Sequence, residues 1–407
     1  MCDSSPSYAL QKALAITRTS TILDSVVEVD IGKCKETLRD PRRIWGISYL
    51  LSPAIFTIIR AIPAMRRLHT IHLARMTLSR TELFTILSSP HLIHLILDSV
   101  QIPKISKLPP PKLRKLTLVA MYSGEALELM ISQLEVSLEY LKLQWCHFRP
   151  QRRSQLPLFP CLRELHYHQS YNSCHTFPDY SMLNELFRLG PQLAFLHLFG
   201  MFHRARVVTF PKSLQHLSIE ALTEWNFAIN ALPQLKSLSL KQCKEWWDPK
   251  LLPPFIRDHF PRITSLHLDI PWPLRNIALV IARAQYNIQS LELRIVTEFG
   301  LNMEGRNLSH KVEIPADDLR TTTFPAALKT LKLEVVQADS ELGRSIAPCT
   351  RWIDHEVLPS VTGLGGPDLR SVEVWFVQPE SKLARERVIW RQWIKLPNGD
   401  WQMDGCL

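Results

Sequence analysis

One six-residue pattern recurs along most of the chain: an apolar residue, two variable residues, a second apolar residue, one variable residue and a third apolar residue. It occurs thirteen times, with its central apolar residue at positions 29, 71, 95, 116, 141, 165, 196, 217, 238, 266, 291, 331 and 372. Steps between positions 71 and 291 are 21 to 31 residues, and the outer steps of 42, 40 and 41 residues indicate insertions. One such hexamer can occur by chance in any apolar strand, whereas thirteen in near-register indicate a repeat architecture.

Each hexamer predicts a short β-strand, because its last two apolar residues alternate with one other residue and therefore point to the same face. A single repeat cannot bury this face, whereas stacked neighbours bury it together. Helical apolar patterns precede several hexamers, and a proline follows some of them, as at Pro90, Pro191 and Pro233. These patterns lie at residues 83–87, 125–134, 182–189, 227–232 and 274–284. The sequence therefore predicts an α/β solenoid shaped like a horseshoe, with a parallel inner sheet and outer helices.

Cysteine lies three residues after the last apolar residue of three hexamers, at Cys34, Cys146 and Cys243. Together with the hexamer, this spacing resembles the cysteine-containing, ribonuclease-inhibitor-like leucine-rich repeats of the F-box/leucine-rich-repeat family, especially its fungal members. The resemblance covers about residues 21–377, and the Leu-Pro start and Cys-x-x-Trp region of an F-box are not found. It implies a protein–protein interaction scaffold that recognises substrates for an SCF-type ubiquitin ligase. We interpret the three thiols as small buried apolar groups with a weak hydrogen-bond donor.

The two ends of the chain differ from the repeats in composition. Residues 1–20 are polar and rich in small residues, which predicts a loose tail or a short cap helix before a solenoid over residues 21–377. Residues 378–407 predict a C-terminal cap made of a basic amphipathic helix over residues 381–393 and a tryptophan-rich hairpin with an Asn-Gly turn. The alternative is a partner site formed by three tryptophans, Trp390, Trp393 and Trp401.

The residues that flank the inward apolar positions are expected to line the concave face of the solenoid. Histidine recurs between the paired apolar residues, and aromatic residues gather in the middle of the array. This pattern is typical of a protein interface with aromatic anchors, and imidazole, which titrates near pH ~6.5, predicts pH-dependent binding. The alternative is a solvated strand face that accepts any polar residue. The candidate protein-binding residues are His72, His94, Tyr140, Lys142, His166, His168, Phe195, His197, Phe199, His216, His267 and Trp375.

Potential metal ligands gather within 15 residues, at Cys161, His166, His168, Cys174 and His175. Cysteine and histidine are zinc ligands, but this spacing matches no zinc-finger pattern, and the two thiols flank the strand that carries the imidazoles. We therefore expect no metal site. Neither a glycine-rich phosphate loop nor a catalytic motif is found, so we expect no cofactor and no catalytic residue. The competing hypothesis is a metal-dependent or hydrolytic enzyme with a site at His166, His168 and His197.

The formal net charge of +10 permits acidic partners. Basic residues cluster mostly between hexamers, which gives a third hypothesis, nucleic-acid association, although no nucleic-acid-binding motif accompanies them. These residues are Lys104, Lys107, Lys112, Arg114, Lys115, Arg149, Arg152, Arg153, Arg204 and Arg206. No apolar stretch reaches ~18 residues, and the eight cysteines form no CxxC pair. We therefore expect a protein of the cytoplasm or nucleus. We expect it to bind a protein ligand and not to associate with a membrane.

Overall fold

The computed structural model describes sixteen segments of the chain, and the chain divides into two compact units, Met1–Gly200 (unit 1) and Met201–Leu407 (unit 2). The boundary between the units lies inside the predicted repeat array, and the expected boundaries at 20/21 and 377/378 stay predictions. The described residues are 6–32, 53–103, 112–121, 130–131, 134, 137–146, 159–168, 187, 190–200, 210–220, 232–241, 262–271, 287–297, 327–337, 368–379 and 386–406.

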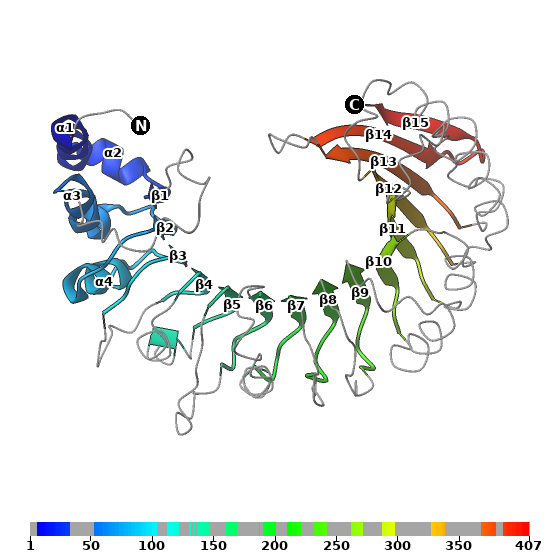
Figure 1. The fold of residues 1–407 in the computed structure, drawn as a ribbon, viewed down its shortest axis with the longest axis horizontal. Coiled ribbons are helices and arrows are strands. Elements are labelled where there is room, and N and C mark those ends of the chain that lie inside the picture. The colour runs from blue at the N-terminus through cyan, green and yellow to red at the C-terminus, as the bar shows by residue number, and fades with distance from the viewer. Residues whose placement is uncertain are drawn as a thin grey trace, which may run out of the picture. The chain divides into compact units, whose positions relative to one another are not determined.

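Unit 1 contains a parallel sheet whose strands follow chain order, with helices near its N-terminal end (Figure 1). Its strands are β1 (Glu28–Ile31), β2 (Thr70–Ala74), β3 (His94–Asp98), β4 (Lys115–Val119), β5 (Tyr140–Gln144), β6 (Glu164–His168) and β7 (Phe195–Phe199). Its helices are α1 (Pro6–Arg18), α2 (Ser20–Ser25), α3 (Pro53–Ala61), the 3-10 helix η3 (Ile62–Ala64) and α4 (Arg80–Leu87). Each of the first seven hexamers coincides with one strand, so these seven strand predictions are confirmed.

The apolar positions of the hexamer form the core of unit 1. In β3, Leu95 and Leu97 are fully buried, whereas the flanking His94 and Asp98 are only half-buried. Leu95 pairs in register with Leu116 of β4, so the buried leucines of successive strands form continuous rows. This alternation agrees with the two-residue period expected for a strand that is buried on one face. The other face of the sheet carries the flanking side chains.

A left-handed residue directly follows four strands of unit 1. Arg75, Ser99, Ala120 and Trp145 have φ angles between 49° and 55°, a region that residues other than glycine rarely adopt. The backbone N–H of each of these residues donates a hydrogen bond to the carbonyl of the last residue in the next strand, as Arg75 does to Asp98. The N···O distance is 2.8 Å in all four cases. The repeated turn therefore ends each of these strands and ties it to its neighbour.

The helices of unit 1 bear on two expectations. Helix α4 coincides with the pattern at residues 83–87, and Ser79 and Glu82 form a capping box in which each side chain bonds the backbone N–H of the other residue. Helix α1 shows that the N-terminal segment is helical, its role as a cap stays a prediction, and Ala13 of α1 is buried while α1 contacts α3. The patterns at 125–134, 182–189, 227–232 and 274–284 lie mostly or wholly outside the described residues.

Unit 2 continues the same strand pattern and ends in a hairpin. Its strands are β8 (His216–Glu220), β9 (Ser237–Lys241), β10 (Ser265–Pro271), β11 (Ser290–Thr297), β12 (Thr330–Gln337), β13 (Ser371–Pro379), β14 (Glu386–Lys395) and β15 (Trp401–Cys406). Strands β8 to β13 are parallel, and β13, β14 and β15 pair antiparallel. The last six hexamers coincide with β8 to β13, so these strand predictions are also confirmed.

The predicted basic helix over residues 381–393 is wrong, because residues 386–395 form strand β14. The backbone of β14 pairs with β13 along its whole length, from Pro379↔Glu386 to Ser371↔Ile394. The hairpin is confirmed: Gly399 has a φ of 92°, and the N–H of Leu396 donates to the carbonyl of Asp400. Trp393 is 4% exposed, which makes it a core residue rather than part of an aromatic partner site. None of the described helices is long and apolar enough to cross a membrane.

Candidate functional site

The sheet of unit 1 brings seven of the candidate residues onto one face. They occupy the first, third and fifth positions of β3, β5, β6 and β7, and these positions share a face because side chains alternate along a strand. Tyr140 pairs in register with Glu164, which pairs with Phe195, and Lys142 pairs with His166, which pairs with His197. We call this set the ring strip: His94, Tyr140, His166, His168, Phe195, His197 and Phe199.

The rings of the strip contact one another continuously from β3 to β7. His94 meets Tyr140 edge-on, with 6.2 Å between ring centroids, and Tyr140 lies 5.2 Å from His166. His166 stacks on Phe195 at 5.3 Å and on His197 at 5.4 Å. His168 stacks on His197 at 5.0 Å and lies 5.3 Å from Phe199. The rings are half-buried, so they form a pre-ordered surface of large, rigid side chains.

His168 lies among rings and cations, and its environment favours the neutral imidazole. Burial, followed by the charges of His197, Lys142 and His166, lowers the pKa of His168 to about 3. Burial and the nearby Lys115 also lower the pKa of His94, whose Nε2 lies 3.1 Å from the Thr117 hydroxyl. The expectation that the histidines sense pH near 6.5 is therefore wrong for His168, because its ring stays uncharged far below that pH.

Three imidazoles of the strip present nitrogen atoms to one another. One ring nitrogen from each of His166, His168 and His197 lies within 4.8 Å of the others. The Nε2 atom of His166 lies 2.7 Å from a carboxylate oxygen of Glu164, two residues earlier on β6. The Nε2 atom of His168 is buried and has no hydrogen-bond partner among the described residues. The structure therefore brings His166 and His168, two histidines of the predicted 161–175 cluster, close to a third histidine, His197. Cys174 and His175 of that cluster lie outside the described residues.

Five candidate residues are not part of the ring strip, and one of them, Lys142, lies on the same face in register with His166. His72 lies on β2, where its Nδ1 atom is 3.2 Å from an Asp30 carboxylate oxygen. His216, His267 and Trp375 lie on β8, β10 and β13 of unit 2 and are separated from one another along the sheet. The twelve residues predicted as one surface therefore fall into a contiguous group in unit 1 and isolated positions elsewhere.

The corresponding face of unit 2 consists largely of compensated charges. His267 and Lys332 both contact Glu292, at 3.2 and 2.7 Å, and Arg294 lies 3.1 Å from Glu334. Trp375 donates from Nε1 to Glu373, and the Lys332 ammonium lies 5.4 Å from the Trp375 ring centroid. Because these charges are paired within the face, they leave little unbalanced charge to attract a ligand. The aromatic surface of unit 1 is the better candidate.

The Glu292 carboxylate gives the charged face of unit 2 a pH dependence. The hydrogen bond from His267, followed by that from Lys332, lowers the pKa of Glu292 from 4.5 to about 2 despite burial. The folded state thus binds this proton less tightly than the unfolded chain, so the stabilisation is present above the unfolded pKa and is lost as pH falls toward 2. We expect Glu292→Gln to lower the free energy of unfolding by about 1–3 kcal/mol at neutral pH.

Urea unfolding of the Glu292→Gln variant at neutral pH and at about pH 3 measures this contribution. The difference from the unaltered protein is expected to shrink at the lower pH. Asp404→Asn, which removes an exposed carboxylate on β15, is the control and is expected to leave the stability unchanged at both pH values. An equal loss at both pH values in Glu292→Gln would contradict the assignment.

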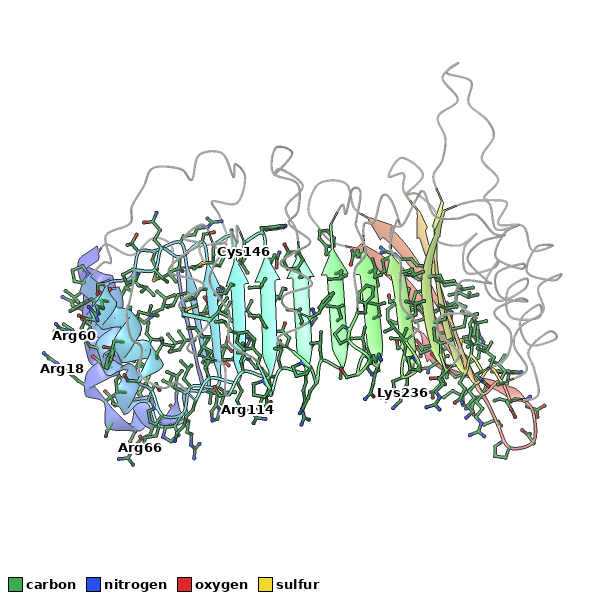
Figure 2. All side chains as sticks on the ribbon, turned by 90° about the horizontal axis from the view of Figure 1, so that it is seen from below. Arg18, Arg60, Arg66, Arg114, Cys146 and Lys236 are labelled. Atoms are coloured by element: carbon green, nitrogen blue, oxygen red, sulfur yellow. The ribbon has the colours of Figure 1, made fainter. Side chains whose placement is uncertain are left out.

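The basic residues and the cysteines show less evidence of a binding site. Arg114 lies at the edge where the strands of unit 1 begin, and its guanidinium donates to both carboxylate oxygens of Glu139, at 2.8 and 2.7 Å (Figure 2). Its charge is therefore compensated, and the clusters at 149–153 and 204–206, with Lys104 and Lys107, lie outside the described residues. At the opposite edge of unit 1, the thiol of Cys146 donates to the carbonyl of Leu118, and burial raises its pKa to about 11. This is the buried, unreactive thiol expected from the sequence.

Glu164, which the structure places against His166, was not predicted as a site residue. A signal was present: Glu164, His166 and His168 alternate along one strand and therefore share a face. Thr117 also follows from strand alternation, because it lies between Leu116 and Leu118 on β4, but its contact with His94 depends on the pairing of β3 with β4. No protein-family model matches the chain, and no curated protein matches it.

Proposed function

We propose that the protein is an interaction scaffold that binds a protein ligand on the ring strip of unit 1. The observation that carries this proposal is the unbroken series of ring contacts from His94 to Phe199. Aromatic side chains are enriched at protein interfaces because they bury a large area and lose little conformational entropy when they bind. Phe195 and Phe199 at one end of the strip supply apolar anchors, and the imidazoles between them supply hydrogen-bonding groups. The expected ligand presents apolar side chains.

The strand pattern supports a more specific architecture. We infer that both units belong to a leucine-rich-repeat solenoid with the ring strip on its concave, horseshoe-shaped inner face and with helices on the outside. The supporting observations are the parallel strands in chain order, the buried leucine rows and the helix α4 between β2 and β3. Such solenoids bind protein ligands on their inner strands.

The resemblance to F-box/leucine-rich-repeat proteins suggests what the ligand would be. We propose that the bound protein is a substrate presented to an SCF-type ubiquitin ligase in the cytoplasm or nucleus. The half-buried Cys146, at the position where that family favours cysteine, supports this version. Its test is the recovery of cullin and adaptor subunits together with the ligand.

Affinity purification of the full chain from native cell extract, followed by quantitative mass spectrometry, tests the proposed surface. The test variant carries Tyr140→Ala, Phe195→Ala and Phe199→Ala together. We expect at least one protein to be retained by the unaltered chain and depleted at least about tenfold by the variant, because central aromatic anchors contribute about 2 kcal/mol or more each.

The matched control carries Ser218→Ala, Ser239→Ala and Lys241→Ala, which alter the corresponding face of unit 2 and are expected to retain the ligand. Circular dichroism and thermal unfolding establish that both variants fold. The proposal is wrong if the ring-strip variant retains the same proteins as the control, or if the unaltered chain retains none.

A further inference from the structure

Three histidines of the ring strip have the chemistry and the placement of a metal-binding group. His166 and His168 alternate on β6, so both side chains point to the same face, and His197 pairs in register with His166 on β7. The three residues therefore occupy neighbouring positions of a rigid parallel sheet. Each offers a ring nitrogen, and these nitrogens lie within 4.8 Å of one another.

We propose that His166, His168 and His197 bind one divalent transition-metal ion of the zinc class. Imidazole is a preferred ligand of zinc, cobalt, nickel and copper ions, whereas magnesium and calcium prefer oxygen. Three imidazole ligands leave one position of a tetrahedral site for water. This site goes beyond the proposed protein-binding function and does not depend on it.

The distances in the structure are compatible with such a site after side-chain rotation. Zinc–nitrogen bonds of about 2.0–2.1 Å place the nitrogens of a tetrahedral site roughly 3.3 Å apart. The observed separations, up to 4.8 Å, exceed this by at most about 1.5 Å. The rings of His166 and His168 lie nearly parallel to that of His197, with interplanar angles of 26° and 27°, so metal binding would require rotation about the side-chain bonds to bring the nitrogens to a common centre. The backbone register would remain unchanged.

The buried Nε2 atom of His168 is an independent indication of a ligand. It has no hydrogen-bond partner among the described residues, and a buried polar atom without a partner costs free energy. Coordination of a metal ion would satisfy this nitrogen. The ring contacts with His197 and Phe199 already hold His168 on this face of the sheet.

Glu164 supplies the orienting carboxylate that metal-binding histidines commonly have. Its carboxylate lies 2.7 Å from Nε2 of His166, and a neutral imidazole that donates from Nε2 leaves Nδ1 as the acceptor for a metal ion. The carboxylate also adds a negative charge beside the site, which offsets the positive charge of Lys142, in register with His166. Gln144, in register with His168, is uncharged.

Metal titration of the purified full chain tests the proposal. After treatment with a chelator and its removal, Zn²⁺ is added in competition with a chromophoric chelator, and Co²⁺ is added separately to record its ligand-field spectrum. We expect one ion per chain, and a cobalt spectrum of four-coordinate nitrogen and oxygen ligation. His168→Phe and His197→Phe keep the stacked rings but remove the nitrogens, and each is expected to weaken zinc binding by at least about tenfold.

The matched control is His94→Phe, which changes a histidine of the same strip outside the cluster and is expected to bind zinc like the unaltered chain. Thermal unfolding without metal checks that all three variants fold alike. The proposal is overturned if the chain binds no stoichiometric zinc, if the two cluster variants bind like the control, or if the cobalt spectrum shows thiolate charge transfer, which would indicate a cysteine site. The extract experiment uses variants that keep all three histidines, so the two proposals fail independently.

Discussion

Replacing Phe159 with alanine is expected to lower the free energy of unfolding by about 3–5 kcal/mol. Phe159 is fully buried in the segment that leads to β6, and its carbonyl accepts a hydrogen bond from the N–H of Leu162 in the turn before the strand. The substitution removes the apolar contacts of the ring and leaves a cavity that the surrounding leucines fill only in part. Urea unfolding followed by tryptophan fluorescence measures the loss.

The chain offers a matched exposed phenylalanine for comparison. Phe84 lies on α4 and is 50% exposed, so Phe84→Ala is expected to change the free energy of unfolding by no more than about 0.5 kcal/mol. Equal effects of the two substitutions would mean that the side chain of Phe159 is not packed as the structure shows. Because Phe159 lies in the segment that leads to the strand with His166 and His168, its replacement is also expected to weaken ligand binding by the ring strip.

Replacing Gly32 with alanine is expected to cost more than about 3 kcal/mol, because two separate penalties act there. Gly32 has a φ of 93°, which side chains of L-residues rarely adopt. A Cβ atom at this position would also approach the carbonyl oxygen of Ala74, on the neighbouring strand, far inside van der Waals contact. The backbone of β1 and β2 must therefore separate locally, and their register, Val29↔Ile71, is weakened.

Gly399→Ala separates these two penalties. Gly399 has nearly the same φ, 92°, but nothing lies within 4 Å of a Cβ built there. The Gly399→Ala variant is therefore expected to lose only the conformational contribution, about 1–2 kcal/mol. Thermal unfolding of both variants, compared with the unaltered chain, gives the difference. If Gly32→Ala is no more damaging than Gly399→Ala, β1 does not approach β2 as closely as the structure shows.

The strands could be predicted from the sequence because their signal is local and repeated. Leu92, Leu95 and Leu97 satisfy the hexamer by themselves, and the pairing of β3 with β4 only buries the residues that the pattern already marks as apolar. The 42-residue step between the first two hexamers does not disturb the pairing of their strands, because Val29 still pairs directly with Ile71. A periodic pattern with many copies is the most reliable signal that a sequence contains.

Strand β14 could not be predicted in the same way, because its conformation depends on a partner. The charged and polar residues from Ser381 to Arg391 satisfy a helical pattern, whereas Val388, Ile389 and Trp393 favour a strand. The open edge of β13 resolves this conflict, since the backbone of β14 pairs with it over its full length. Tertiary pairing therefore overrode a local preference, and Trp393 became buried instead of exposed.

The candidate site was predictable in composition but not in its electrostatics. The outward positions of Tyr140, His166 and Phe195 follow from strand alternation. The strongly lowered pKa of His168 does not, because it arises from burial and from the charges of other residues on the sheet. The grouping of His166 and His168 with His197 was part of the competing hypothesis, and the pairing of β6 with β7 places His166 and His197 in register across a 31-residue step.

The constant register of unit 2 has a consequence for how such a chain can change. Leu331 pairs with Leu291 across 40 residues and with Val372 across 41, in the same way that Leu217 pairs with Leu238 across 21. Doubling the length of a connection costs only about 0.6 kcal/mol of loop-closure entropy, which is small beside the burial of one leucine. Natural selection can therefore lengthen, shorten or exchange the segments between strands without altering the strand face. The same tolerance makes these connections suitable places to graft a foreign peptide.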